Sequence, residues 1–486
     1  MPASWNRFWR MASDYACILE SGKGGRYTFV GSDPGEVVSG KNGISRVTAK
    51  SAAHGTAGWI ERELPPGTPI EAMRSWMHPR QAPRPEGAPD CAGGVFGFWS
   101  YDAVRYLEKL PESAEDELGT PDFLFMSFRR LWVADRLENA VYLAVHAEPG
   151  ADPSEERLDA CWREATEAAD EMERSWRHWL GTAEDPETSE RVRRMREWAE
   201  LETEFDPERL PGRKASMSPE AFQDAVRRIQ AYISQGDVFQ VNLSVRQSVP
   251  VDVPAEELYD WLRIVNPSPY MGMLRTPAFS LVSASPELLV KLDDGRLSAR
   301  PIAGTRRRGR TPDEDRAMEQ ELLASEKERA EHIMLVDLER NDLGRVAAYG
   351  SVKVPELLTV ERYSHVMHLV SQVEARLAPG KDALDVVAAM FPGGTITGAP
   401  KIRTMEIIEE LEPVRRGPYT GSMGWIDYAG NMEFNIIIRT VLLAGGVGHI
   451  QAGAGIVIDS DPRREYQECL NKAKALWKAL LGAGRL

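Results

Sequence analysis

The feature of this 486-residue sequence that most constrains its fold is the way its strands are joined. Residues 419–455, YTGSMGWIDYAGNMEFNIIIRTVLLAGGVGHIQAGAG, contain apolar segments separated by turns of hairpin length, which is typical of antiparallel sheets. Helical segments occur between such strands in mixed order rather than in strict alternation with single strands. We therefore predict an α+β fold, a two-lobed sandwich of antiparallel β-sheets flanked by helices, and not a doubly wound parallel sheet.

Local signals place several elements of the C-terminal half. Ser218 and Pro219 suit an N-cap and a first helical residue, and helical apolar spacing then continues to Gly236. The following residues, VFQVNLSVRQSV, alternate with period two and predict a strand. One long helix is predicted over 313–338, and a last helix begins at Pro462.

Changes of composition along the chain predict three segments. Residues 1–150 alternate short apolar runs with Gly/Pro turns and are predicted to form an N-terminal lobe. Residues 151–216 are rich in Glu, Arg, Ala and Trp, which predicts a surface helix followed by a charged, mobile linker. Residues 217–486 are predicted to form a separate C-terminal domain.

Charge and cysteine usage exclude several classes of function. The chain has 59 basic and 74 acidic residues, a net charge of −15, which argues against nucleic acid and anionic membranes as partners. No signal peptide and no run of about 18 apolar residues is present. The cysteines lack CxxC spacing, so neither a zinc site nor a disulfide framework is indicated, and we expect a cytoplasmic protein; they are Cys17, Cys91, Cys161 and Cys469.

The segment 391–401, FPGGTITGAPK, is predicted to be a loop whose backbone approaches a ligand closely. A helix follows, with apolar residues at helical spacing: Ile402, Met405, Ile408 and Leu411. Its first N–H groups and the Lys401 ammonium could bind an anion at the loop. Gly398 is followed by Ala-Pro-Lys, so the loop is not a Walker motif, and a plain Gly/Pro connection remains an alternative.

Two pairs of carboxylates have a spacing that suits Mg²⁺. Glu328 and Glu331 are three residues apart on one predicted helix, and Glu465 and Glu468 are three apart on another, so each pair shares a helix face. Hard oxygen ligands are those that Mg²⁺ prefers. Glu468 with Lys472 at i, i+4 also fits an exposed ion pair, so the spacing alone leaves both interpretations open.

A second group of residues suits an anionic substrate. Arg439 ends the apolar segment NIIIR, and Gly453-Ala454-Gly455 offers bare backbone N–H groups, so together they could bind carboxylates. His365 and His368 lie three residues apart in the segment YSHVMHLVS. A histidine in such an apolar segment is either a core residue or, with a pKa near neutral, a general acid or base.

These segments together resemble the signature blocks of the chorismate-utilising enzymes. The blocks are PIAGT (301–305), AEHIMLVDLERNDLGR (330–345), YSHVMHLVS (363–371), FPGGTITGAPK (391–401), IIIRT (436–440), QAGAG (451–455) and DPRREYQECLNKA (461–473), with CILESGKGGRYTFVG (17–31) near the N-terminus. The family includes anthranilate synthase component I, aminodeoxychorismate synthase component I, isochorismate synthase and salicylate synthase. The likeness covers nearly the whole chain.

The resemblance implies a role for each matching position. It implies Mg²⁺ as the cofactor, with Glu331 and Glu468 as principal ligands and Glu328 and Glu465 beside them. It implies that chorismate is bound by Gly304, Thr305, Tyr419, Arg439, Gly453, Ala454, Gly455 and Lys472. It also implies catalytic positions at His368 and Thr395, next to the C4–O bond that breaks, and at Glu287 and Lys401.

The blocks also favour one branch of the family. The sequence GDVFQ has Gln240 where the isochorismate and salicylate synthases carry a lysine that activates water, so ammonia is the favoured nucleophile. Ala303 stands where many aminodeoxychorismate synthases carry a lysine that attacks the ring, as in anthranilate synthases and in a lysine-free aminodeoxychorismate subset. The sequence blocks as a whole are most similar to those of that subset. Anthranilate synthase is the alternative, and a non-catalytic chorismate- or tryptophan-binding protein is the third.

Two partners of the site follow from the same resemblance. The cysteines lack the sequence context of an amide-hydrolysing nucleophile, so ammonia is expected from a separate glutamine amidotransferase subunit.

In the anthranilate branch the block around Glu20 and Ser21 holds feedback tryptophan. A corresponding pocket is therefore expected here, lined by Glu20, Ser21, Pro269, Tyr270 and Met271.

Overall fold

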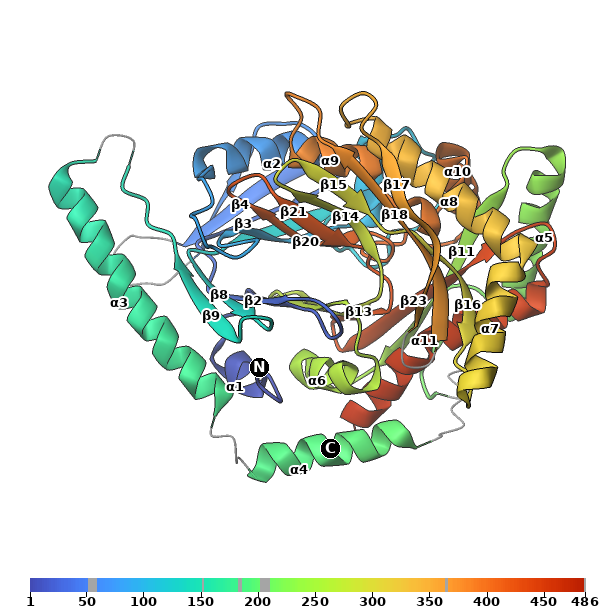
Figure 1. Ribbon diagram of the computed structural model, residues 1–486, viewed down its shortest axis with the longest axis horizontal. Coiled ribbons are helices and arrows are strands. Elements are labelled where there is room, and N and C mark those ends of the chain that lie inside the picture. Colours follow the sequence, from blue (N-terminus) through green and yellow to red (C-terminus); the bar gives the residue numbers. More distant parts are fainter. Residues whose placement is uncertain (51–58, 151–152, 182–185, 202–209, 363–365, 485–486) are drawn as a thin grey trace.

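The computed structural model describes residues 1–50, 59–150, 153–181, 186–201, 210–362 and 366–484. Two large antiparallel sheets lie one above the other, with helices on their outer faces (Figure 1). The sequence prediction of an α+β sandwich of antiparallel sheets flanked by helices is confirmed.

The first sheet has the strand order β10-β11-β23-β22-β13-β12-β1-β2-β8-β9, and β19 pairs with β11. Its strands are β1 Ala16–Glu20, β2 Tyr27–Ser32, β8 Arg130–Asp135, β9 Ala140–Val145, β10 Lys214–Ala215, β11 Gln240–Pro250, β12 Tyr270–Arg275, β13 Phe279–Ser285, β19 Gly398–Ala399, β22 Thr440–Ala444 and β23 Val447–Ile456. We call it sheet A.

The second sheet, sheet B, has the order β16-β18-β15-β14-β21-β20-β6-β7-β3-β4-β5, and β17 pairs with β18. Its strands are β3 Glu36–Lys41, β4 Ile44–Lys50, β5 Trp59–Glu63, β6 Gly94–Trp99, β7 Phe123–Ser127, β14 Leu288–Asp293, β15 Arg296–Ala299, β16 Ile302–Arg307, β17 Lys353–Arg362, β18 Val366–Arg376, β20 Ser422–Asp427 and β21 Met432–Asn435.

The helices cover the outer faces of the sheets and one end of the sandwich. They are α1 Asn6–Met11, α2 Pro69–Met77, η1 His78–Arg80, η2 Tyr101–Tyr106, α3 Glu155–Leu180, α4 Pro186–Glu200, α5 Pro219–Gln235, α6 Ala255–Val265, α7 Pro312–Ala324, α8 Glu326–Gly344, α9 Ala383–Met390, η4 Gly394–Ile396, α10 Lys401–Leu411 and α11 Pro462–Ala483. Helices α2, α8 and α9 lie beside sheet B, whereas α1, α3, α6 and α11 lie beside sheet A (Figure 1).

Both sheets continue across the N-terminal and C-terminal parts of the chain. In sheet A, β1 pairs with β12, with Ile18 opposite Met273. In sheet B, β6 pairs with β20, with Gly97 opposite Gly424. Main-chain hydrogen bonds therefore connect the first 150 residues to the segment that follows residue 216 at the centre of each sheet.

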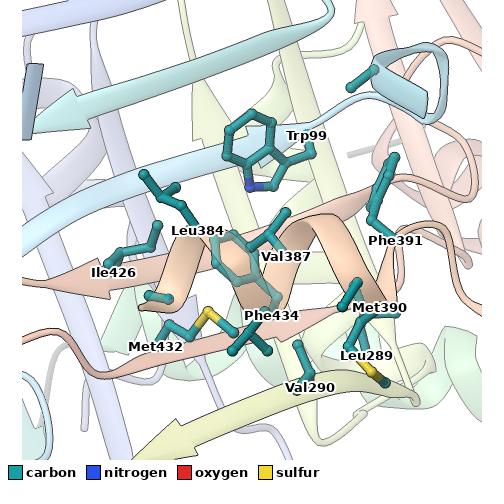
Figure 2. Packing of buried hydrophobic residues seen from close by; sticks show 14 of the residues in the cluster. Trp99, Leu289, Val290, Leu384, Val387, Met390, Phe391, Ile426, Met432 and Phe434 are labelled. Carbon is teal, nitrogen blue, oxygen red and sulfur yellow. The ribbon is translucent and has the colours of Figure 1, made fainter. Parts of the chain in front are cut away.

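The hydrophobic core has separate layers because each sheet buries both faces. Aromatic side chains fill the space between the sheets, where the ring of Phe29 lies 5.9 Å from that of Phe96. On the outer face of sheet B, Phe434 and Trp99 pack against Leu384 and Val387 of helix α9 (Figure 2). These apolar contacts fix the sheet whose strands β14, β16 and β18 carry part of the candidate site.

The structure confirms several predicted elements. Helix α5 has Ser218 as N-cap, Pro219 in its first turn and Gly236 as a left-handed C-cap. Strand β11 and helix α11, which begins at Pro462, also occur where the sequence predicts them.

Three local predictions were wrong. The helix predicted over 313–338 is two helices, because Ser325 ends α7 and its hydroxyl caps the N-terminus of α8. Ile402 is 46% exposed rather than part of the apolar face of α10. The charged linker contains α4, whose Arg191 forms ion pairs with Glu257 and Asp260 of α6.

Phe434 provides a test of the core. Replacing Phe434 with Ala removes a fully buried ring between β21 and α9, so we expect the free energy of unfolding to fall by about 3–5 kcal/mol. Leu137, which is 73% exposed, is the control, and its replacement by Ala should change that free energy by less than about 0.5 kcal/mol. Denaturant unfolding measures both values, and equal losses would contradict this description of the core.

Candidate active site

The candidate site lies where the end of β11 meets β23, the 391–400 loop and helices α8 and α11. The register of β11 and β23 places Asn242 opposite Gly455 and Ser244 opposite Gly453. Helix α11 packs on β23 and α8 packs on β16 and β18. Residues that are far apart in the sequence therefore share one site.

Glu287 is a half-buried carboxyl group at the centre of the site. It precedes β14 and accepts a hydrogen bond from the hydroxyl of Thr395 at 2.6 Å. Burial raises the pKa of Glu287 to about 7, although the Thr395 hydroxyl and the charges of Lys472 and Arg439 lower it. Near neutral pH this group can therefore either donate or accept a proton.

His368 lies on β18 directly opposite Thr305 of β16. Its Nδ1 is 3.0 Å from the Thr305 hydroxyl. Burial lowers the pKa of His368, so the neutral imidazole prevails at pH 7, while a hydrogen bond to the Gly304 main chain opposes this shift. In the neutral ring a single nitrogen carries the hydrogen, so a substrate hydroxyl that takes this N–H replaces the Gly304 carbonyl as its acceptor. His365 lies outside the described residues.

The two cations of the site are held by main-chain carbonyl groups. Arg439 has a left-handed backbone, with φ of 51°, and its Nη1 donates to the carbonyl of Lys472 at 2.6 Å. The Lys472 ammonium donates to the carbonyl of Gly453 at 3.1 Å. Burial lowers the pKa of Arg439. Both cations can exchange neutral acceptors for substrate carboxylates, which bind them more strongly.

The predicted glycine positions are closely packed. A Cβ atom at Gly453 would lie 2.5 Å from Oδ1 of Asn242 and 2.8 Å from the main-chain oxygen of Leu243, so a side chain there requires the backbone to move. A Cβ atom at Gly455 would lie 2.4 Å from Nε2 of Gln240, and a side chain there requires that flexible amide to move. Ala454 faces the opposite side of β23, in a hydrophobic cluster with α5 and α10.

Sequence reasoning missed Asn242 as a site residue and treated Gln240 only as a missing lysine. Within the part of the chain that the structure describes, Oδ1 of Asn242 and Oε1 of Gln240 are buried without a hydrogen-bond partner. Such unsatisfied acceptors are rare in protein interiors and are common in ligand sites. The period-two alternation of β11 places both on one side of the strand, and this signal could have found them.

The four predicted acidic residues come from the facing helices α8 and α11. Burial raises the pKa of Glu331, and the charges of Glu328 and Glu465 raise it further, which indicates that carboxylates of both helices are close together. Oε1 of Glu328 accepts a hydrogen bond from Arg306 at 2.9 Å, and Oε1 of Glu468 is 3.7 Å from the Lys472 ammonium. The Lys327 ammonium is 3.9 Å from Glu331, so three of the four carboxylates have a cation within about 4 Å in the absence of a metal.

This donor set fits a magnesium ion that is completed by the substrate. No three acidic, histidine or cysteine side chains of the described residues converge closely enough to hold a metal alone. Mg²⁺ commonly uses one or two protein carboxylates, with water and substrate oxygens as its other ligands. Gly304, with φ of 64°, brings the PIAGT segment beside Glu328, since a Cβ atom there would lie 3.0 Å from Oε2 of that residue.

Lys401 does not point into the loop as the sequence predicted. Its ammonium forms an ion pair with Asp342 of α8 and donates to the carbonyl of Met390 at 3.3 Å. The expected anion site at the start of α10 is thereby corrected. The Lys401 ammonium pairs with Asp342 because a buried carboxylate without a cation would be strongly destabilising.

The five residues predicted for a tryptophan pocket all line one cavity of about 640 Å³. They are Glu20, Ser21, Pro269, Tyr270 and Met271. The carboxylate of Glu20 points away from its centre, because it accepts hydrogen bonds from Arg263, Tyr259 and Trp5. Pro286 and Leu288, on either side of Glu287, line the same cavity. Its occupation by tryptophan stays a prediction.

The fold and the site agree with the family to which this chain belongs. The chorismate binding enzyme family matches residues 16–478, so the chain is a chorismate-utilising enzyme. It is 46% identical over 463 residues to aminodeoxychorismate synthase component 1 of Bacillus subtilis (strain 168), which covers 95% of this chain and 91% of that protein. It is 44% identical over 465 residues to anthranilate synthase component 1 of Thermus thermophilus, with 95% and 90% covered.

Solved structures show the same architecture. Anthranilate synthase component I from Streptococcus pneumoniae TIGR4 superposes with a TM-score of 0.75 at 31% identity, covering 93% of this chain and 92% of that one. The menaquinone-specific isochorismate synthase MenF from Escherichia coli shares the fold, with a TM-score of 0.65 at 18% identity over 96% and 88% of the two chains. Among the described residues, no helix has the length and apolar character needed to span a bilayer.

The raised pKa of Glu287 makes the pH dependence of turnover a test of the site. With Glu287 acting as a base, we expect kcat/KM for chorismate, corrected to constant unprotonated ammonia, to fall tenfold per pH unit below about 7. Glu287→Gln should abolish this limb and lower the rate by about 10²–10⁴-fold. An unchanged acid limb in the variant would show that another group titrates.

The cavity behind Ser21 gives a second test. Ser21 lies at the cavity wall, so Ser21→Tyr should fill part of the space that tryptophan would need. Calorimetry should detect heat when tryptophan is added to the wild type and none with the variant, while thermal unfolding confirms that both are folded. Equal heats from the two proteins would reject the pocket.

Proposed function

We propose that this chain is an aminodeoxychorismate synthase component I, which converts chorismate and ammonia to 4-amino-4-deoxychorismate for 4-aminobenzoate and folate synthesis. The observation that carries the proposal is the uncharged Gln240 beside Gly455. An amide cannot deprotonate water, whereas ammonia is nucleophilic without such a base. The 46% identity to the Bacillus subtilis aminodeoxychorismate synthase component 1 supports this choice of branch.

The binding of chorismate is proposed to use both charged sides of the site. Arg439 and the amides of Gly453 and Gly455 would bind the enolpyruvyl carboxylate. Glu331 and Glu468, with Glu328 and Glu465 beside them, would hold Mg²⁺ against the ring carboxylate. When bound, Mg²⁺ would neutralise that carboxylate. The substrate would then be fixed from two sides, with C4 toward His368.

The exchange of hydroxyl for amine is assigned to three side chains. The Glu287 carboxylate, positioned by Thr395, accepts a proton from the attacking ammonia. The 4-hydroxyl accepts an N–H hydrogen bond from His368 while its C4–O bond breaks, and it leaves as water with the proton that Glu287 returns to it. Lys401 is held by Asp342, so direct replacement by ammonia is favoured over a covalent lysine intermediate.

Ammonia is proposed to come from a separate glutamine amidotransferase subunit. All four cysteines are buried, and burial raises the pKa of the Cys17, Cys91 and Cys469 thiols. A glutaminase nucleophile needs the opposite, an accessible thiol with a lowered pKa. The relatives are named component 1, which is consistent with a second component.

Anthranilate synthase component I is the second candidate. Ala303 lacks the side chain needed for covalent attack on the ring, as in the anthranilate branch. The Thermus thermophilus relative, at 44% identity, is an anthranilate synthase component 1. In that case ammonia would attack C2, and pyruvate would be eliminated.

The metal assignment can be tested by charge removal without change of shape. Glu331→Gln and Glu468→Gln should each lower turnover at limiting Mg²⁺ by at least about 100-fold, since each loses a ligand charge. Glu410→Gln, on the exposed side of α10, is the control and should retain wild-type turnover. Normal activity of Glu468→Gln at limiting Mg²⁺ would reject the assignment.

The product distinguishes the two candidates. The pure chain is incubated with chorismate, Mg²⁺ and ammonium at alkaline pH, without a lyase, and followed by fluorescence and mass spectrometry. We expect a product that keeps the enolpyruvyl group and yields 4-aminobenzoate only after a lyase is added. Glutamine in place of ammonium should give no product. Prompt anthranilate fluorescence with release of pyruvate would establish the second candidate instead.

A further inference from the structure

The loop that carries Thr395 is closed at its two ends by a single side chain. Met390 is the last residue of α9 before the loop, and Lys401 is the first residue of α10 after it. The Lys401 ammonium donates to the carbonyl of Met390 at 3.3 Å and forms an ion pair with Asp342 of α8. One cation therefore joins both ends of the loop to a third element.

The ion pair lies in the interior. The side chains of Lys401 and Asp342 are only 13% and 4% exposed. Loss of one partner would leave the other as an uncompensated buried charge, which strongly destabilises the local arrangement. The pair can therefore hold the loop in place, unlike an ion pair at the surface.

Helix α8 touches the loop beside Thr395. A Cβ atom at Gly394 would lie 2.0 Å from Cδ2 of Leu338, so loop and helix are in direct contact there. Thr395, the next residue, donates its hydroxyl to Glu287 at 2.6 Å. A displacement of the loop relative to α8 would therefore change the hydrogen bond that orients Glu287.

The charges around the loop also depend on Lys401. Glu339, one turn before Asp342 on α8, is buried, and its Oε2 has no hydrogen-bond partner among the described residues. Burial and the neighbouring charges of Asp342 and Glu287 together raise the pKa of Glu339 to about 8, against the opposing charge of Lys401. The Lys401 ammonium therefore offsets part of the negative charge that Asp342 and Glu339 place beside the loop.

We propose that Lys401 is a positioning residue: its bonds to Asp342 and to the Met390 carbonyl hold the 391–400 loop so that Thr395 orients Glu287. Lys401 is then neither the nucleophile that attacks the ring nor a ligand of a substrate anion. The inference rests on the proposed roles of Glu287 and Thr395, but it is independent of which amine product forms. Lys401 thus has a structural function, although it takes no direct part in the proposed reaction of chorismate.

The experiment compares variants of the full chain by steady-state consumption of chorismate, with Mg²⁺ and ammonium at saturation. Lys401→Met should lower kcat by about 10–100-fold and change KM for chorismate by less than about threefold, because the lost interaction acts on the reacting geometry. Lys401→Arg should keep kcat within about fivefold of the wild type, since a guanidinium can also pair with Asp342. Asp342→Asn removes the acidic partner of the same ion pair, so it should lower kcat and leave KM nearly unchanged, as Lys401→Met does.

A double-mutant cycle tests the route through Thr395. Thr395→Val should lower kcat, and adding Lys401→Met to it should cause less than about a threefold further loss, because coupled positions are not additive. Arg105→Met is the matched control. Arg105 is 12% exposed and pairs with Glu409 at the other end of α10, so this variant should lower the melting temperature and leave kcat within about twofold.

Each other outcome identifies what fails. A Lys401→Arg variant as inactive as Lys401→Met would show that the amine itself reacts. Independent, multiplicative losses in the cycle, or an equal loss of kcat in Arg105→Met, would overturn the positioning role. Unimpaired Lys401→Met beside impaired Thr395→Val would reject this inference alone. Unimpaired Thr395→Val would reject both this inference and the assignment of Thr395 in the proposed function. Where Lys401→Met does not fold, Asp342→Asn and its cycle with Thr395→Val decide in the same way.

Discussion

The arrangement of the site depends on the pairing of charges that the fold has buried. The guanidinium of Arg416 and the carboxylate of Glu412 are almost fully enclosed and bond to each other, with Nε donating at 2.9 Å. The same guanidinium donates to the carbonyls of Ile396 and Asn242, at 2.9 and 2.7 Å. One ion pair thus joins the catalytic loop, strand β11 and the end of α10, and the strong cost of an unpaired buried charge keeps these elements together.

The residues proposed to contact substrate have fewer hydrogen-bond and ion-pair partners within the protein. Among the described residues, Arg439 and Lys472 donate to main-chain carbonyls, and the Lys472 ammonium also lies 3.7 Å from Glu468. Asn242 and Gln240 have buried acceptor atoms without partners in the described part of the chain. Positive groups lie on one side of the site and the carboxylates of α8 and α11 lie on the other, as the proposed binding of chorismate and Mg²⁺ requires. The buried Arg416–Glu412 pair thus holds the elements around a site whose own polar groups are incompletely paired, which is consistent with electrostatic preorganisation.

Local sequence signals predicted the elements whose cause is local. The caps of α5 and the alternation of β11 depend on neighbouring residues, and they were found. The i, i+3 spacing also found the acidic faces of α8 and α11, because helix geometry alone sets which residues share a face. The break at Ser325 was missed, although a serine followed by Glu328 three residues later is a capping signal.

What the sequence could not give depends on contacts between distant segments. The pairing of β1 with β12 joins residues more than 250 positions apart, and no local period indicates it. The same holds for the capture of Lys401 by Asp342 and for the burial that lowers the pKa of His368 and raises that of Glu287. Resemblance to the family supplied the positions of these residues, but their charge states required the tertiary structure.

The most direct test measures whether substrate and metal complete the charge balance of the site together. Mg²⁺ binding to the Glu287→Gln variant, whose turnover is expected to be at least about 100-fold slower, is measured by calorimetry without ammonia, with and without saturating chorismate. We expect chorismate to tighten Mg²⁺ binding at least about tenfold, and Mg²⁺ to tighten chorismate binding by the same factor, since linkage is reciprocal. Equal affinity for Mg²⁺ in the presence and absence of chorismate would contradict the view that the substrate supplies the missing ligands between α8 and α11.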